Sequence, residues 1–181
     1  AFYMRGRANF DLGQNQQAIR DFTSALQSRQ EAPILYYRAA SYYYQRDHQR
    51  ALQDLDQAIQ IAPSFEYHGL RGQITYDLGQ SERSIEDSSA GIRLNPRDAR
   101  LYINRGNAYG RLAKLDQALQ DYNMAIQVGP TLAIAWYNRG NYYAHVGNRA
   151  AAIRDFREAA RLGNDQARQR LVDGGRGLAA P

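Results

Sequence analysis

The chain has 181 residues, of which 44% are hydrophobic and 23% are charged, a balance typical of a folded protein rather than a disordered one. It contains no cysteine, which excludes disulfide bonds, thiolate zinc sites and cysteine nucleophiles. No stretch reaches the roughly 18 apolar residues of a transmembrane helix, so we expect a soluble protein without a membrane span. The formal net charge is +5, and 22 of the 23 Lys and Arg residues are Arg, which favours fixed ion pairs with carboxylates as much as nucleic-acid binding.

The start of the chain is unusual for a complete protein. It begins at Ala1, with neither Met nor a signal-like segment, so we expect a piece of a longer protein whose first helix is cut short. The compartment stays open, since cytoplasm and cell envelope both fit the sequence.

An Arg followed by a small residue recurs five times, at intervals of 33, 33, 34 and 34 residues. The five pairs are Arg5–Gly6, Arg38–Ala39, Arg71–Gly72, Arg105–Gly106 and Arg139–Gly140. A second small residue follows twelve positions later in every copy, as Ala18, Ala51, Ser84, Ala118 and Ala152. A period of this length indicates a repeat protein.

Each repeat is expected to form two helices joined by a tight turn, because apolar residues recur at three- and four-residue spacing. In chain order we predict repeats over 1–31, 32–64, 65–98, 99–132 and 133–164, then a capping helix over 165–173 and a flexible tail over 174–181, all in one solenoid domain. The clearest copy is the fourth, with helices expected over 101–113 and 116–128. Pro63, Pro96 and Pro130 close three of the repeats, since Pro cannot continue a helix.

The fifth repeat resembles the tetratricopeptide repeat, with Trp136, Gly140 and Tyr143 followed by Ala152 and Phe156 at that family's spacing. The resemblance implies an all-α fold, a right-handed solenoid of antiparallel helix pairs. One departure is systematic, because Arg replaces the Leu that usually precedes the small residue. The third repeat also departs at its packing positions, which hold His68, Thr75, Ser84, Ser88 and Gly91.

An Asp recurs in every second helix in register with the five Arg residues. These are Asp21, Asp54, Asp87, Asp121 and Asp155, to be paired with Arg5, Arg38, Arg71, Arg105 and Arg139. We expect one ion pair per repeat, formed within a repeat or between neighbours. The favoured interpretation is a structural ladder that fixes helix register, and the alternative is a row of charged binding groups.

The resemblance further implies that the first helices line a concave peptide-binding groove. The aromatic candidates are Tyr3, Phe10, Tyr36, Tyr43, Tyr44 and Tyr76, and the remaining candidates are Arg100, Asn104, Asn107, Arg111, Tyr137, Asn138 and Asn141. The alternative is that several of these Tyr side chains are packing residues.

Chaperone adaptors of this family hold a C-terminal carboxylate with Lys, Arg and Asn side chains. The resemblance therefore implies a carboxylate clamp formed by Arg100, Asn104, Asn138 and Arg168, since such donors suit a carboxylate. The match is partial, because Val172 stands where a second cation is expected.

The sequence favours a non-catalytic interaction module that binds a partner peptide or helix, including an acidic or C-terminal one. The three His residues lack metal-ligand spacing and no nucleophile motif or phosphate loop is present, so no catalytic, metal or cofactor site is predicted. Nucleic-acid binding is the alternative, since the pI is about 9.6. Its candidate surface is Arg149, Arg154, Arg157, Arg161, Arg168 and Arg170. A self-assembling scaffold is the third hypothesis.

Overall fold

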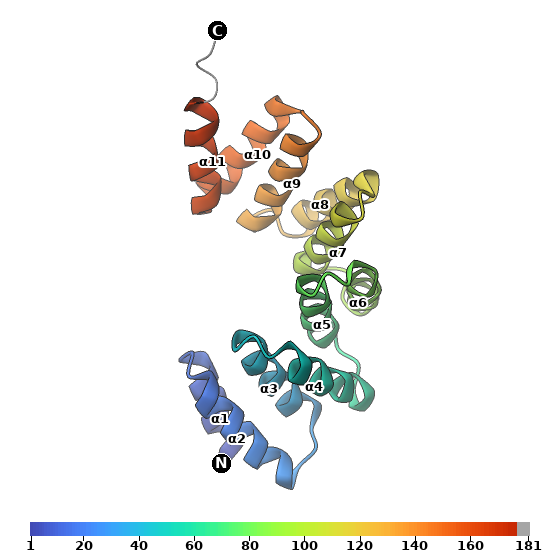
Figure 1. The fold of residues 1–181 in the computed structure, drawn as a ribbon, viewed down its shortest axis with the longest axis vertical. Coiled ribbons are helices and arrows are strands. Elements are labelled where there is room, and N and C mark those ends of the chain that lie inside the picture. Colours follow the sequence, from blue (N-terminus) through green and yellow to red (C-terminus); the bar gives the residue numbers. More distant parts are fainter. Residues whose placement is uncertain (177–181) are drawn as a thin grey trace. The chain divides into compact units, whose positions relative to one another are not determined.

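The structure is a computed structural model that describes residues 1–176, with side chains described as far as Asp173. All of the regular secondary structure in this part of the chain is α-helical (Figure 1), which confirms the predicted all-α class. The chain divides into two compact units, Ala1–Leu94 and Asn95–Pro181, and each is described by itself.

The first unit holds three helix pairs. They are α1 (Phe2–Asp11) with α2 (Asn15–Ser28), α3 (Ala32–Tyr44) with α4 (His48–Ile61), and α5 (Phe65–Asp77) with α6 (Ser81–Leu94). Each helix packs against the next one along the chain (Figure 1). The second helix of one repeat therefore contacts the first helix of the following repeat, which is the stacking that a helical repeat array requires.

The second unit holds two helix pairs and a last helix. They are α7 (Ala99–Arg111) with α8 (Leu115–Val128), α9 (Ala133–His145) with α10 (Arg149–Arg161), and α11 (Asp165–Arg176), which packs on α10. Helix α11 continues past residue 173, where the sequence predicts the end of the capping helix. The rest of the predicted tail, residues 177–181, lies outside the described residues.

In all five repeats, the turn inside the helix pair contains a residue with a left-handed backbone conformation at the same position. Three repeats place Gly there, and Gly13 has φ of 72°. The other two place Arg46 and Ala113, at φ of 63° and 55°. A side chain in this region costs about 1 kcal/mol or more, so the turn geometry is imposed by the helix pairing in these two repeats.

The small residue on each first helix lets a large side chain of the second helix lie against the backbone. A Cβ added to Gly6 would lie 2.7 Å from the Phe22 ring, and one added to Gly140 would lie 2.7 Å from the Phe156 ring. In the second repeat Ala39 has the smaller Leu55 in the same buried cluster. The first, second and fifth repeats therefore match a small residue with a large one across the helix pair.

The third repeat has a polar interior. In α6, Ser81, Ser84 and Ser88 are buried, and their hydroxyl oxygens have no hydrogen-bond partner. Gly72 faces Ser88 rather than an aromatic ring. Because an unpaired buried hydroxyl is unfavourable, this repeat gains less from folding than its neighbours.

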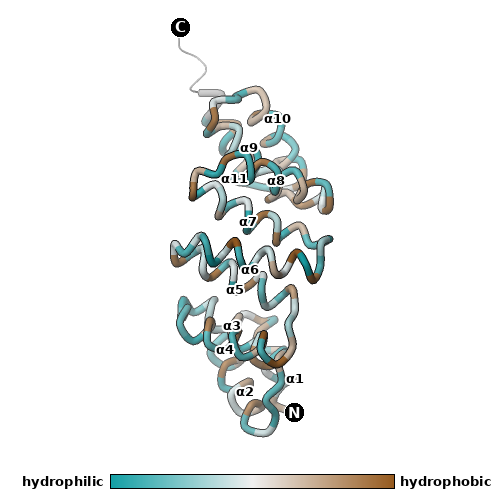
Figure 2. The backbone as a smooth tube through the Cα atoms, turned by 90° about the vertical axis from the view of Figure 1, so that its right-hand side faces the viewer, coloured by the Kyte–Doolittle hydropathy of each residue, from teal (hydrophilic) through white to brown (hydrophobic). Residues whose placement is uncertain are grey.

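Polar and apolar residues alternate along the helices of both units (Figure 2). This is typical of helices that bury one face and expose the other. None of the helices in residues 1–176 has the length and hydrophobicity needed to cross a membrane.

Replacing a buried hydroxyl in α6 should stabilise the chain. We expect Ser84→Ala to raise the free energy of unfolding by about 1 kcal/mol, because it removes an unsatisfied polar group and restores the Ala found at this position in the other four repeats. Urea denaturation measures the change. The reverse substitution Ala118→Ser, at the matching buried position of α8, is the control and should destabilise the chain. A lower stability for Ser84→Ala would show that the hydroxyl is satisfied.

Candidate functional site

The five recurrent Arg residues each contact the Asp sixteen residues later, across the helix pair of their own repeat. In the second repeat the contact is bidentate, with Arg38 Nε and Nη2 each 2.7 Å from an Asp54 oxygen. All five Asp residues are buried, with 4 to 5% of their surface exposed. Such geometry satisfies both carboxylate oxygens and fixes the two helices relative to one another.

In the second, third and fifth repeats the same guanidinium also reaches back to the preceding repeat. Its Nη1 donates to a polar side chain two positions after that repeat's own Asp. The acceptors are Thr23 for Arg38 at 3.2 Å, Asp56 for Arg71 at 2.6 Å, and Asn123 for Arg139 at 2.7 Å. The Arg therefore joins two repeats, and this explains the systematic replacement of Leu. The periodic polar residue was the available sequence signal for this contact.

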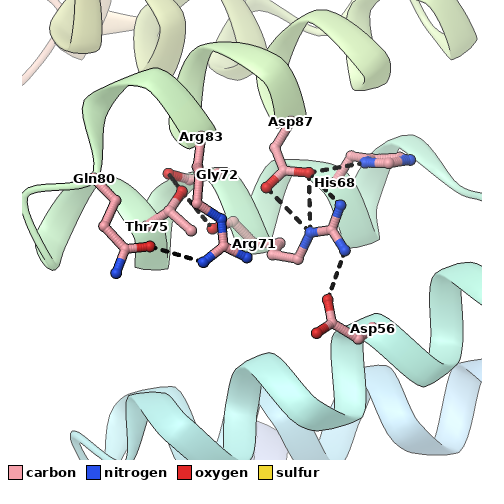
Figure 3. A network of polar contacts seen from close by, with 8 residues as sticks. All are labelled: Asp56, His68, Arg71, Gly72, Thr75, Gln80, Arg83 and Asp87. Carbon is pink, nitrogen blue, oxygen red and sulfur yellow. Dashed lines mark hydrogen bonds and ion pairs between the residues drawn. The ribbon is translucent and has the colours of Figure 1, made fainter.

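Figure 3 shows the network of the third repeat, in which Asp87, His68, Arg71 and Asp56 are joined by polar contacts. Asp87 accepts from Arg71, and His68 Nδ1 lies 3.2 Å from its Oδ1. Burial raises the pKa of Asp87, but the hydrogen bonds from His68 and Arg71 outweigh it, so the pKa lies below its usual value. Because the folded pKa is the lower one, this carboxylate stabilises the fold above its unfolded pKa, and the contribution is lost as the pH falls through the folded value.

The Arg–Asp pairs should be coupled. We expect Arg139→Ala to lower the free energy of unfolding by about 3 kcal/mol, because Asp155 stays buried without its partner. Arg139→Leu should lower it less, since Leu refills the volume of the Arg stem. Adding Asp155→Asn to Arg139→Ala should recover part of the loss in a double-mutant cycle.

The control for this cycle is Arg161→Ala. Arg161 pairs with Glu158 on the exposed surface of the same unit, so its loss should change the stability little. Strictly additive effects of the Arg139 and Asp155 substitutions would contradict a coupled pair.

Aromatic side chains of α1 and α3 form a continuous face in the first unit, which we call the aromatic face. Ring centroids lie 5.7 Å apart for Phe10 and Tyr37, 5.9 Å for Phe10 and Tyr44, and 5.7 Å for Tyr43 and Tyr44. Tyr3 joins the face through Tyr37 at 6.4 Å. These spacings are typical of favourable aromatic pairs.

Tyr37 is the centre of this face, although the sequence analysis did not select it. It contacts Tyr3, Phe10 and Tyr36, and the guanidinium of Arg7 lies 3.9 Å above its ring. Tyr37 stands two residues before the small residue of its repeat, as the selected Asn104 and Asn138 do in theirs. Its place in the repeat could therefore have identified it as a candidate.

The remaining aromatic candidates divide between structural and accessible positions. Tyr43 donates a hydrogen bond to Asp77 at 2.9 Å, and burial together with this bond raises the pKa of Tyr43 to about 12. Tyr36 lies 5.1 Å from Tyr67 of α5, and Tyr76, also on α5, is half-buried. Tyr44 is the most accessible of them, with 65% of its surface exposed.

Both cations of the predicted carboxylate clamp have acidic neighbours at the start of their own helices. Arg100 contacts Asp98 at 2.6 Å, and Arg168 contacts Asp165 at 2.5 Å. Both Arg side chains are well exposed, so these ion pairs are weak and exchangeable. The cations remain accessible to a competing carboxylate.

The amide candidates of the second unit form a partly complete network. Asn107 accepts hydrogen bonds from Tyr122 at 3.0 Å and from Asn138 at 3.2 Å. The amide oxygen of Asn141, one repeat later, is buried and has no partner. The two donors are missing because Phe156 and Val172 occupy the positions that match Tyr122 and Asn138.

The other candidates of this unit lie around the network. Asn104 is half-buried in α7, and Arg111 is exposed at the end of the same helix. Tyr137 packs on Phe156, with ring centroids 5.9 Å apart.

A hydroxyl added at position 156 should satisfy Asn141. We expect Phe156→Tyr to raise the free energy of unfolding by about 1 kcal/mol, because the Tyr hydroxyl can donate to the Asn141 oxygen as Tyr122 does to Asn107. Thermal unfolding measures the shift. Tyr122→Phe is the matched control and should destabilise the chain by a similar amount. A loss of stability for Phe156→Tyr would contradict the shared geometry of the two repeats.

Family models described as "Tetratricopeptide repeat" match residues 1–31, 32–65, 99–132 and 133–165, which together make up more than half of the chain. Tetratricopeptide repeat protein 6 of Homo sapiens is 28% identical over 113 residues, covering 59% of this chain and 22% of its own length. A TPR repeat-containing protein of Methanocaldococcus jannaschii is 29% identical over 105 residues, covering 54% of this chain and 18% of its own length. The chain spans about a fifth of the length of these curated relatives.

Three solved structures illustrate the shared fold. MamA from Desulfovibrio magneticus RS-1 has a TM-score of 0.78 at 19% identity, covering 91% of this chain and 94% of its own. The thermophilic TPR protein TTC0263 of Thermus thermophilus has a TM-score of 0.80 at 20% identity, covering 95% and 96%. YrrB, described as a TPR protein with an unusual peptide-binding site, has a TM-score of 0.73 at 19% identity, covering 98% and 91%.

Proposed function

The chain belongs to the tetratricopeptide repeat family, and we propose that it is a non-catalytic protein-interaction module that holds a partner peptide against its first helices. The observation that carries the proposal is the aromatic face of the first unit, where Tyr44 stands exposed beside Phe10 and Tyr43. Tyr side chains offer a large contact area at a low cost in conformational entropy.

The peptide-binding description of YrrB supports this proposal, since that protein has the same fold. Within this chain, the Arg–Asp pairs keep the first helices fixed, so the aromatic face needs little rearrangement on binding. A pre-organised surface loses less entropy when it binds its ligand.

The exposed Arg side chains of the second unit suit the acidic or C-terminal group of a peptide. Arg100 and Arg168 are held by Asp98 and Asp165, which an incoming carboxylate would replace. The five Arg residues of the repeat pairs are committed to buried carboxylates, which reduces the positive charge available to nucleic-acid phosphates and favours a peptide over the nucleic-acid alternative.

The test is a peptide array screened with the intact chain, followed by titration of the best binders. Tyr44→Ala should weaken binding of these peptides by about tenfold, because an exposed aromatic anchor carries much of the binding energy at an interface. The matched control is Ile61→Ala, which changes an exposed apolar residue at the end of α4, the second helix of its repeat. It should leave the affinity unchanged.

Arg100→Ala should weaken acidic and C-terminal peptides by more than tenfold while leaving thermal stability nearly unchanged. Tyr43→Ala should alter the sequence preference more than the acceptance of acidic groups, because the Tyr43 ring packs against that of Tyr44 with centroids 5.7 Å apart. The proposal fails if neither Tyr44→Ala nor Arg100→Ala changes any affinity.

A further inference from the structure

A cavity of about 590 Å³ lies in the second unit, beside helices α10 and α11. Five of its lining residues come from one face of α10, at intervals of three and one residues. They are Arg149, Ala152, Ile153, Phe156 and Arg157. Residues with this spacing share one side of a helix, so the cavity runs along α10.

The lining combines apolar and charged side chains. Ile153 of α10 and Leu171 of α11 are half-buried, and the charged residues of the lining are Arg149, Arg157, Arg170 and Asp173. Apolar surface beside an excess of guanidinium groups over carboxylates is complementary to an amphipathic segment whose charged residues are acidic.

Two of the Arg residues at this cavity differ from their neighbours in the sequence. Arg157 and Arg170 have no hydrogen-bond or ion-pair partner among the described residues. Arg161 and Arg168, close to them in the chain, contact Glu158 and Asp165. The cavity therefore holds unpaired positive charge next to the half-buried side chains of Ile153 and Leu171.

The position of the cavity fits a helix better than an extended segment. In the same unit, α7 packs against α8 and α9 packs against α10, so each first helix has a second helix beside it. Helix α11 continues this series, packs on α10 and is the last helix of the described residues. The cavity is thus bordered by helices, with Ala144 of α9 completing the lining beside α10 and α11.

We propose that this cavity is a docking site for an acidic amphipathic helix of a partner protein. The apolar residues of that helix pack on Ile153 and Leu171, and its Glu or Asp side chains pair with Arg157 and Arg170. This site is separate from the aromatic face of the first unit and from Arg100, so it extends the proposed function with a second binding surface of different chemistry.

The probe is a fluorescein-labelled peptide of about 16 residues, long enough for roughly four helical turns, with Leu on one face and Glu on its flanks. Fluorescence anisotropy with the intact chain measures its affinity. We expect Arg157→Glu and Arg170→Glu each to weaken binding by at least tenfold. Arg154→Glu, on the exposed surface of α10 but outside the cavity lining, is the matched control and should change the affinity less than twofold.

Three further arms make the assignment specific. A scrambled peptide of the same composition should bind at least tenfold more weakly, and equal binding would overturn the proposal because charge alone would explain it. Tyr44→Ala should leave the affinity for the acidic peptide unchanged, so that failure here and failure of the aromatic face are distinguishable. The proposal would also be overturned if the acidic peptide does not bind the unmodified chain. It would likewise be overturned if a single-stranded oligonucleotide binds and Arg157→Glu and Arg170→Glu abolish that binding.

Discussion

The helix packing within each unit depends on a guanidinium that contacts a buried carboxylate. Arg38 holds Asp54 on its partner helix and Thr23 on the preceding repeat, so a single side chain fixes two interfaces. A Leu at the same place would fill the volume but could not satisfy the Asp. Because the Asp is buried, each helix pair is correctly formed only when the guanidinium is in register. The aromatic face on α1 and α3 and the α10 side of the cavity both lie on helices positioned in this way.

Most of the fold could be predicted from the sequence, because the repeat period and the small–large pattern are local and recur five times. The resemblance to the tetratricopeptide repeat is confirmed by the family models, and the all-α class by the structure. Even the polar interior of the third repeat is visible as Ser84 and Ser88 in place of Ala and a large residue. Spacing alone was sufficient, since helical packing depends on which residues share a face.

The candidate site was harder to predict, because the role of a side chain depends on contacts that no repeat pattern specifies. Tyr43 and Tyr44 are adjacent in the sequence, yet Tyr43 is tied to Asp77 of the next repeat while Tyr44 is exposed. Tyr37 shares its register with Asn104 but was not selected, although it contacts Tyr3, Phe10 and Tyr36 in the structure. The pairing of Arg100 with Asp98, two residues before it, is likewise a choice among several rotamers that composition leaves open.

The matching of small and large residues within each pair has a consequence for how such repeats can be exchanged. Gly6 admits the Phe22 ring, whereas Ala39 shares its cluster with Leu55, so the first helix of the second repeat cannot be paired with the second helix of the first repeat. Recombination between copies would preserve the fold when the breakpoint falls between repeats. A breakpoint inside the turn at Arg46 would join Ala39 to an aromatic partner and force the backbones apart. The helix pair, rather than the single helix, is therefore the unit in which this chain can be inherited or engineered.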